Sequence, residues 1–234
     1  MKKKISIIIP CLNEEKNIKK IYVAIKQKFK EKNFEVIYVD DDSLDNTQKE
    51  ILKLNENENN VRYIFRKKDK DLSRSFNAGL NISRSKYVIL MDCDLQHSHK
   101  DANYMKKVIF KEKLDMVIGS RFLNKKLRGN LYLVRSIISL IFIAFINFFF
   151  IKKTTDPLSG FFICKKKIII ESKKNYFLKG YKILFDIIYN SRCNINSKDL
   201  QINFKKRIIG KSKLNIRIVI LFLHQIIFTL SKKL

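Results

Sequence analysis

Apolar and polar residues follow two alternating patterns along the first half of the chain. Short runs rich in isoleucine and valine, such as residues 5–9, are separated by longer polar segments in which apolar residues recur every three or four positions. The short runs predict buried strands and the longer segments predict amphipathic helices. Strands are expected at 5–10, 34–43, 61–67, 87–91 and 115–122, and helices at 14–30, 43–56, 74–83 and 101–112.

Regular alternation of strand and helix is the signature of a mostly parallel sheet with helices on both of its faces. The sequence therefore predicts an α/β fold through residue 122. Ligands in such folds bind beyond the carboxyl ends of the strands. Four of the expected strands end in polar residues, at 13–14, 40–42, 92–96 and 120–121.

The fourth strand end carries acids at alternating positions. In an extended chain Asp92, Asp94 and Gln96 share one face, so they approach a single ligand if the strand persists that far. Two carboxylates and an amide oxygen are hard donors, suited to Mg²⁺ or Mn²⁺. The alternative is a solvated strand end whose acids cap the next helix. His97 follows as either a further metal or phosphate contact or a turn residue.

After residue 122 the chain becomes more apolar. A helix is expected at about 131–151, where residues 136–151 carry no charge, and another at about 215–231, and basic residues flank both. A spanning helix needs about 20 apolar residues, so the uncharged run is short for that purpose. Apolar faces with basic flanks are typical of helices that lie in a membrane interface. Core helices are the main alternative, and a membrane span remains open.

Composition adds charge to this picture. The chain has 234 residues and a formal net charge of +27, which reflects either a lysine-rich background composition or a phosphate-bearing partner. The four cysteines are scattered without zinc-binding spacing, which favours a reduced cytosolic compartment. The basic and then apolar N-terminus is too short in its apolar part for a signal peptide, so it is expected to be the first strand.

Eight segments together resemble family 2 glycosyltransferases of the GT-A fold, and most closely their dolichol-phosphate (polyprenyl-phosphate) mannosyltransferase branch. They occur in family order and cover nearly the whole chain. The segments are SIIIPCLNEEKNI (6–18), VDDDSLDNT (39–47), DLSRSFNAGL (71–80), MDCDLQHSH (91–99), VIGSRF (117–122), DPLSGFFICKK (156–166), GYKILFDI (180–187) and KKRIIGKSKL (205–214).

The resemblance implies a division of labour along the chain. Residues 1–130 would form the nucleotide-sugar-binding GT-A core, and residues 131–234 would complete the catalytic domain on the acceptor side. The metal ligands would be Asp92, Asp94 and Gln96. The nucleotide-sugar contacts would be Pro10, Glu14, Asp40, Asp41, Asp92, Cys93 and Lys182. The catalytic residues would be Asp94, Arg121 and Arg207, and the acceptor or phosphate contacts would be Arg135, Ser139, Lys211 and Lys213.

The same resemblance implies an inverting, metal-dependent transfer of a hexose, expected to be mannose from GDP-mannose, to a polyprenyl or dolichyl phosphate at the cytoplasmic membrane face. A phosphate acceptor is already largely ionised at neutral pH and needs no general base. Two motifs typical of other branches, an ED dipeptide after residue 122 and QxxRW, are missing here, which fits such an acceptor. Leu12 and Asp42 depart from the family pattern and leave base and sugar specificity open.

Other readings remain open within and outside this class. A family 2 enzyme that uses UDP-glucose or another donor, or that acts on a cell-surface glycan, would share most of these segments. A basic membrane-binding or nucleic-acid-binding protein without activity is the non-enzymatic alternative, although the enzyme reading implies no nucleic-acid partner. The expected location is peripheral or monotopic, with a separate membrane-anchoring protein as a potential partner.

Overall fold

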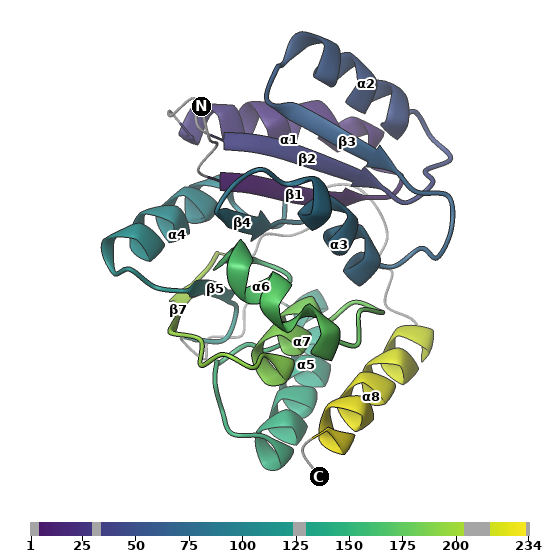
Figure 1. Cartoon of the computed structure of the whole chain (residues 1–234). Coiled ribbons are helices and arrows are strands. Elements are labelled where there is room, and N and C mark those ends of the chain that lie inside the picture. The colour runs from purple at the N-terminus through teal and green to yellow at the C-terminus, as the bar shows by residue number, and fades with distance from the viewer. Residues whose placement is uncertain (1–4, 30–33, 124–129, 204–215, 233–234) are drawn as a thin grey trace.

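The computed structural model describes residues 5–29, 34–123, 130–203 and 216–232 (Figure 1). Its elements follow in the order β1 (Ile5–Cys11), α1 (Glu15–Lys28), β2 (Phe34–Asp40), α2 (Thr47–Asn57), β3 (Val61–Phe65), α3 (Leu72–Ile82), β4 (Tyr87–Leu90), α4 (His99–Lys111), β5 (Met116–Ser120), α5 (Asn130–Phe149), β6 (Phe162–Lys165), α6 (Lys166–Ser172), the 3₁₀ helix η1 (Lys173–Asn175), α7 (Ile183–Asn190), β7 (Ser197–Gln201) and α8 (Ile216–Ser231).

The strands form one sheet in the order β3-β2-β1-β4-β6-β5-β7. β6 runs antiparallel to its neighbours β4 and β5, and the remaining neighbouring pairs are parallel. The prediction of a mostly parallel α/β sheet is therefore confirmed. The sequence patterns did not predict β6, β7, α6 or α7, which all lie after residue 122.

Helices cover both faces of this sheet because β1 presents apolar side chains to each. Ile7 and Ile9 belong to a core shared with α1, α2 and α4, whereas Ile8 belongs to a core shared with α3, α5, α6, α7 and α8. The period-2 alternation of a strand places successive side chains on opposite faces. A strand that is apolar at both odd and even positions must therefore be buried on both sides, as β1 is. Figure 1 shows helices on both faces of the sheet that contains β1.

The strand before Asp92 does not persist as far as Gln96. β4 ends at Leu90, and Leu95 has a left-handed backbone with φ of 62°. Residues 92–96 are therefore a turn, and the expectation that Asp92, Asp94 and Gln96 share one face of an extended strand is wrong. The three residues still lie within one five-residue segment at the end of β4.

The two apolar helices expected after residue 130 are present as α5 and α8. They lie side by side, with the rings of Phe142 and Phe222 5.4 Å apart (Figure 1). Their inward faces complete the second core, and each keeps an exposed apolar stripe. Among the residues that the structure describes, no helix combines the length and the apolar character that crossing a membrane requires.

Gly79 allows α3 to lie close to the sheet. A Cβ atom at this position would come within 2.6 Å of Ile8 Cγ2 and 3.1 Å of Val39 Cγ2. The Gly79→Ala variant is expected to lower the free energy of unfolding by about 1–2 kcal/mol, because overpacking outweighs the gain in helix propensity. Urea denaturation measures this loss. Lys20→Ala, at an exposed position of α1, is the control, and an equally stable Gly79→Ala variant would contradict the close packing.

Candidate active site

The parallel ladders bring the carboxyl ends of β1, β2 and β4 to one edge of the sheet. Cys11 is paired with Asp40, and Leu90, the last residue of β4, is paired with Ile8. Burial raises the pKa of the Cys11 thiol well above its ordinary value, and the charges of Cys93, Asp40, Glu14 and Asp41 raise it further. Groups from all three strand ends thus lie near enough to one buried sulfur atom to raise its pKa.

Hydrogen bonds between the β1–α1 and β2–α2 connections hold this edge together. The backbone N–H of Asn13 donates to Ser43 Oγ at 2.8 Å, and the backbone N–H of Leu44 donates to Asn13 Oδ1 at 2.8 Å. Thr47 Oγ1 accepts the backbone N–H of Glu14 at 2.8 Å. Asn13 therefore joins the two connections and does not cap α1, where the N-cap residue is Glu14.

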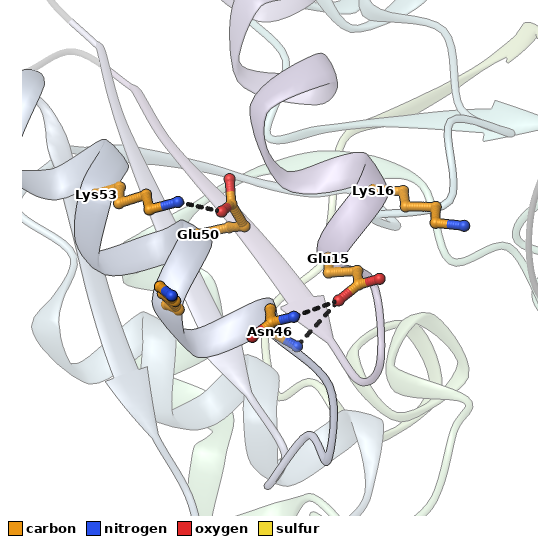
Figure 2. A pocket seen from close by; sticks show the side chains of 6 residues that line it. Glu15, Lys16, Asn46, Glu50 and Lys53 are labelled. Carbon is orange, nitrogen blue, oxygen red and sulfur yellow. Dashed lines mark hydrogen bonds and ion pairs between the residues drawn. The ribbon is translucent and has the colours of Figure 1, made fainter.

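The first turns of α1 and α2 are joined in the same way. Glu15 accepts hydrogen bonds from the backbone and side-chain N–H groups of Asn46, as Figure 2 shows. A polar cavity of about 360 Å³ lies beside them, and its wall includes the ion pair between Lys53 and Glu50. Among the residues that the structure describes, none predicted from the sequence to form the site lines this cavity, so the cavity lies outside the candidate site.

The two acids at the end of β2 differ in their surroundings. Asp40 is fully buried and accepts hydrogen bonds from the backbone N–H and hydroxyl of Ser43 and from Gln48 Nε2. It therefore holds the 40–48 connection in shape. Asp41 accepts hydrogen bonds through Oδ1 from Ser75 Oγ at 2.6 Å and from Arg66.

Burial raises the pKa of Asp41, while the hydrogen bond from Ser75 and the charge of Arg66 oppose that rise. Arg66 and Ser75 are site residues that the sequence analysis missed. They lie 25 and 34 positions from Asp41, so no local pattern joins them to it. Their contacts fix the orientation of the Asp41 carboxylate.

The turn after β4 carries the predicted metal ligands. The side chain of Asp92 is 35% exposed, whereas Asp94 and Gln96 are buried. Asp94 Oδ1 accepts the backbone N–H of Gln96 at 3.0 Å, and His97 Nδ1 accepts the backbone N–H of Asp92 at 3.1 Å. The Asp92 carboxylate is thus the member of the set that is open to solvent.

Arg121, at the end of β5, is held by a carboxylate that the sequence analysis did not single out. Asp156 is fully buried and accepts from Arg121 Nε at 2.7 Å, Nη2 at 2.8 Å and the backbone N–H at 3.1 Å. Burial lowers the pKa of the Arg121 guanidinium, but Asp156 and the nearby charge of Asp92 outweigh it and raise the pKa overall. Arg121 therefore stays cationic beside the Asp92 turn.

The loop that contains Asp156 is tied to the edge strand β7. Asp199 accepts hydrogen bonds from Thr154 Oγ1 at 2.7 Å and from the backbone N–H and hydroxyl of Thr155, both at 2.6 Å. Ser120 Oγ lies 2.7 Å from Thr155 Oγ1. These contacts fix the loop on both sides of the β5 terminus, which explains how a bidentate ion pair is held at this position.

A second loop approaches the Asp41 end of the site. Gly180 accepts the backbone N–H of Ser73 at 2.9 Å, and Lys182 precedes α7 and is half-buried. Burial raises the pKa of Tyr181, and the carboxylates of Asp71 and Asp41 raise it further. Tyr181 and Lys182 therefore lie in a loop that faces the acidic edge.

The segment before that loop is held by the buried carboxylate of Asp186, which belongs to α7. Asp186 accepts the backbone N–H groups of Phe177 and Leu178 at 2.9 and 3.0 Å. Burial raises the pKa of Asp186, and hydrogen bonds from those N–H groups oppose the rise. Gln225 of α8 donates to the carbonyl of Lys182 at 3.2 Å, so α8 is joined directly to the loop.

Some of the remaining predicted site residues have described side chains, and others do not. Pro10 lies in β1 and is half-buried, Cys93 is buried in the turn after β4, and Ser139 is half-buried on α5. Arg135 belongs to α5, for which the structure describes only the backbone at that position. Arg207, Lys211 and Lys213 lie outside the described residues.

The chain belongs to glycosyl transferase family 2, whose model matches residues 6–173. The sheet described above, with its acidic strand ends, is thus that of a family 2 glycosyltransferase.

Two curated relatives extend the similarity. The dolichol-phosphate mannosyltransferase of Pyrococcus furiosus is 30% identical over 95% of this chain and 62% of its own length. The dolichol-phosphate mannosyltransferase of Mycosarcoma maydis is 27% identical over 95% of this chain and 77% of its own length. The chain therefore spans less than two thirds of the Pyrococcus protein.

Solved structures support the GT-A fold. Glucosyl-3-phosphoglycerate synthase from Mycobacterium tuberculosis, in complex with Mn²⁺, UDP-glucose and phosphoglyceric acid, superposes with a TM-score of 0.69. The match covers 98% of this chain and 79% of that protein at 15% identity. At that identity the likeness establishes the fold, and the predicted GT-A fold is confirmed.

The Arg121–Asp156 pair is expected to couple strongly in a double-mutant cycle. Arg121→Met leaves a fully buried carboxylate without its countercharge and is expected to cost about 3 kcal/mol in unfolding free energy. Adding Asp156→Asn removes that charge, so a coupling energy of about 1–3 kcal/mol is expected from urea denaturation of the four proteins.

The control cycle uses the exposed pair Lys53–Glu50, with Lys53→Met and Glu50→Gln. Exposed pairs couple by about 0.2–1 kcal/mol. A coupling energy for Arg121 and Asp156 no larger than that of the exposed pair would contradict the structural role assigned to their contact.

Proposed function

We propose that this protein transfers a hexose from a nucleotide-sugar donor to a polyprenyl phosphate at the cytoplasmic membrane face. The observation that carries the proposal is the combination, in one chain, of an acidic sheet edge beside Arg121 and an exposed apolar stripe on α5 and α8. The similarity to dolichol-phosphate mannosyltransferases supports the acceptor class and favours mannose from GDP-mannose.

The donor nucleotide is proposed to bind across the ends of β1 and β2. Asp41 is fixed by Arg66 and Ser75 with its carboxylate at the sheet edge, which suits an acceptor for N–H groups of a base. Glu14 and Pro10 lie at the neighbouring end of β1. UDP-glucose remains the second candidate donor, since the structurally similar synthase from Mycobacterium tuberculosis binds it.

A divalent cation fits the turn after β4. Asp92, Asp94 and Gln96 offer oxygen donors, and Gly160 leaves space beside Asp92, where a Cβ atom would lie 3.8 Å from both carboxylate oxygens. Within the described part of the chain, no three His, Cys, Asp or Glu side chains converge on one point. Mg²⁺-type sites with few protein ligands use substrate phosphates to complete the coordination. When bound, the cation would offset the negative charge of the donor diphosphate.

The chemistry assigned to the protein itself is electrostatic. The acceptor phosphate is a dianion near neutral pH, so no side chain has to remove a proton from it. Arg121, whose cationic state Asp156 supports, is proposed to stabilise the negative charge that develops on the leaving diphosphate. Lys182 is proposed to neutralise a phosphate from the opposite loop, with Arg207, Lys211 and Lys213 contributing from the basic segment 205–213.

The apolar stripe is proposed to rest in the membrane interface. Its most exposed members are Phe148 at 83%, Ile141 at 62% and Ile227 at 61%. They stand on two adjacent helices, and the exposed residues Lys152, Lys153 and Arg217 lie at the ends of these helices. An apolar face with a basic border binds anionic lipid surfaces through both buried area and charge.

The proposal also divides the chain into a donor-binding part and an acceptor-side part. Residues 1–130 bind the donor, and residues 131–234 place Arg135, Ser139 and the membrane-facing helices on the acceptor side. The two parts share the sheet, because β6 lies between β4 and β5. A separate membrane-anchoring protein is an additional proposed partner.

The reaction is tested by radiolabel transfer. Membranes bearing the protein are given GDP-mannose, UDP-glucose or UDP-N-acetylglucosamine with polyprenyl phosphate and Mn²⁺ or Mg²⁺. Label from GDP-mannose is expected in an acid-labile lipid fraction. Asp94→Ala is expected to reduce it by a factor of about 100 or more, because charge stabilisation at the diphosphate is lost.

Lys53→Ala, beside the unrelated cavity, is the matched control and is expected to keep wild-type transfer. Transfer from UDP-glucose would establish the alternative donor. Label in no lipid from any donor, with folded protein, would refute the polyprenyl-phosphate acceptor and direct the search to glycan acceptors.

Membrane binding is tested with the triple variant Ile141→Gln, Phe148→Gln and Ile227→Gln. Burial of one large apolar side chain contributes about 1.5–3 kcal/mol, so the variant is expected to bind phosphatidylcholine–phosphatidylglycerol vesicles at least about 30-fold more weakly. Co-sedimentation measures the partition coefficient. The control replaces Tyr104 and Ile170, which are exposed on α4 and α6, with Gln. Equal losses in the two variants would argue against a specific membrane face.

A further inference from the structure

His97 is buried in the turn after β4, and the function proposed above gives it no role. Its side chain is 3% exposed, and its ring lies flat on Phe161 with centroids 4.6 Å apart and planes 10° apart. Phe161 is itself fixed, since it is fully buried and its carbonyl accepts the backbone N–H of Gly119 at 2.9 Å. The imidazole therefore has a rigid support.

The hydrogen bond of His97 determines the tautomer of the ring. Nδ1 accepts the backbone N–H of Asp92 at 3.1 Å, so this nitrogen carries no proton. The 3.7 Å approach of Nδ1 to Asp92 Oδ2 is consequently not an ion pair. His97 therefore acts on Asp92 through the backbone N–H of that residue.

The turn that this bond closes contains a strained residue. Leu95 has φ of 62°, a left-handed conformation that is unfavourable for a non-glycine residue and persists only where surrounding contacts enforce it. The bond from Asp92 to His97 spans Leu95, and the ring stacked on Phe161 anchors its far end. His97 thus supplies a contact that keeps the turn in its strained shape.

We propose that His97 is a positioning residue that holds the Asp92–Gln96 turn in the shape that presents its oxygen atoms to the divalent cation. The neighbouring Gly160 is part of the same arrangement, because a Cβ atom there would lie 3.9 Å from His97 Cε1 as well as beside the Asp92 carboxylate. The inference rests on the proposed cation site. Groups that orient metal ligands typically change metal affinity by about 10–100-fold when they are replaced.

Two substitutions separate the hydrogen bond from the ring. His97→Phe keeps an aromatic ring to stack on Phe161 but removes the acceptor for the Asp92 N–H. His97→Asn keeps an oxygen acceptor near the Nδ1 position but removes the ring. Mn²⁺ affinity is measured by electron paramagnetic resonance on the full chain in the presence of GDP and, in parallel, UDP.

The expected result is a Mn²⁺ dissociation constant raised about 10–100-fold in His97→Phe and less than about threefold in His97→Asn. Metal-free nucleotide binding, measured by calorimetry, is expected to stay within about twofold of wild type in both variants, since the contacts of Asp41 are unchanged. Thermal melting is expected to drop in His97→Asn, which separates stability from cation binding.

Two results would overturn the inference while the proposed cation site stands. One is wild-type Mn²⁺ affinity in His97→Phe, and the other is an equal loss in both variants. Failure of the wild-type protein and of Asp94→Ala alike to bind Mn²⁺ with either nucleotide would instead remove the cation site and the inference with it. The wild-type measurement therefore distinguishes the two failures.

Discussion

Parallel pairing of β1 with both β2 and β4 is the constraint on which the candidate site depends. Because the three strands run in the same direction, their carboxyl ends meet at one edge of the sheet. Beyond the strand ends, the backbone N–H and C=O groups must find hydrogen-bond partners in the connecting segments and not in a neighbouring strand. Asn13, Ser43 and Thr47 supply those hydrogen bonds. The two connections are therefore joined to each other by hydrogen bonds within the protein itself.

Gathering acids at this edge carries an electrostatic cost that neighbouring cations and N–H groups offset. Burial raises the pKa of Asp41, and Arg66 and Ser75 oppose that rise. Arg121 lies beside Asp92 and is itself paired with the buried Asp156. Asp41 and Asp156 thus each accept hydrogen bonds from a cation held in a fixed direction, and such preorganised charges are what electrostatic catalysis uses.

The site and the apolar surface are physically connected. Gln225 of α8 donates to the Lys182 carbonyl, and Asp186 holds the loop that leads to Lys182. The loop in turn accepts a hydrogen bond from α3 through Gly180. The loop that precedes α7 therefore links α8, which carries part of the exposed apolar stripe, to α3, which carries Ser75 and so helps to orient Asp41. This continuity is compatible with the proposed transfer from a water-soluble donor to a lipid phosphate.

Local sequence patterns by themselves determined the alternating strands and helices, the acidic strand ends and the two apolar helices, because each depends on spacing within a few residues. Tertiary structure alone decided the antiparallel insertion of β6, the pairing of Arg121 with Asp156 and the support of Asp41 by Arg66. It also turned the chain at Leu95, so the proposed metal ligands lie in a turn spanned by the Asp92–His97 hydrogen bond and not in an extended strand. These features join residues far apart in the chain or depend on which side chain a turn can reach, and no local periodicity encodes such contacts.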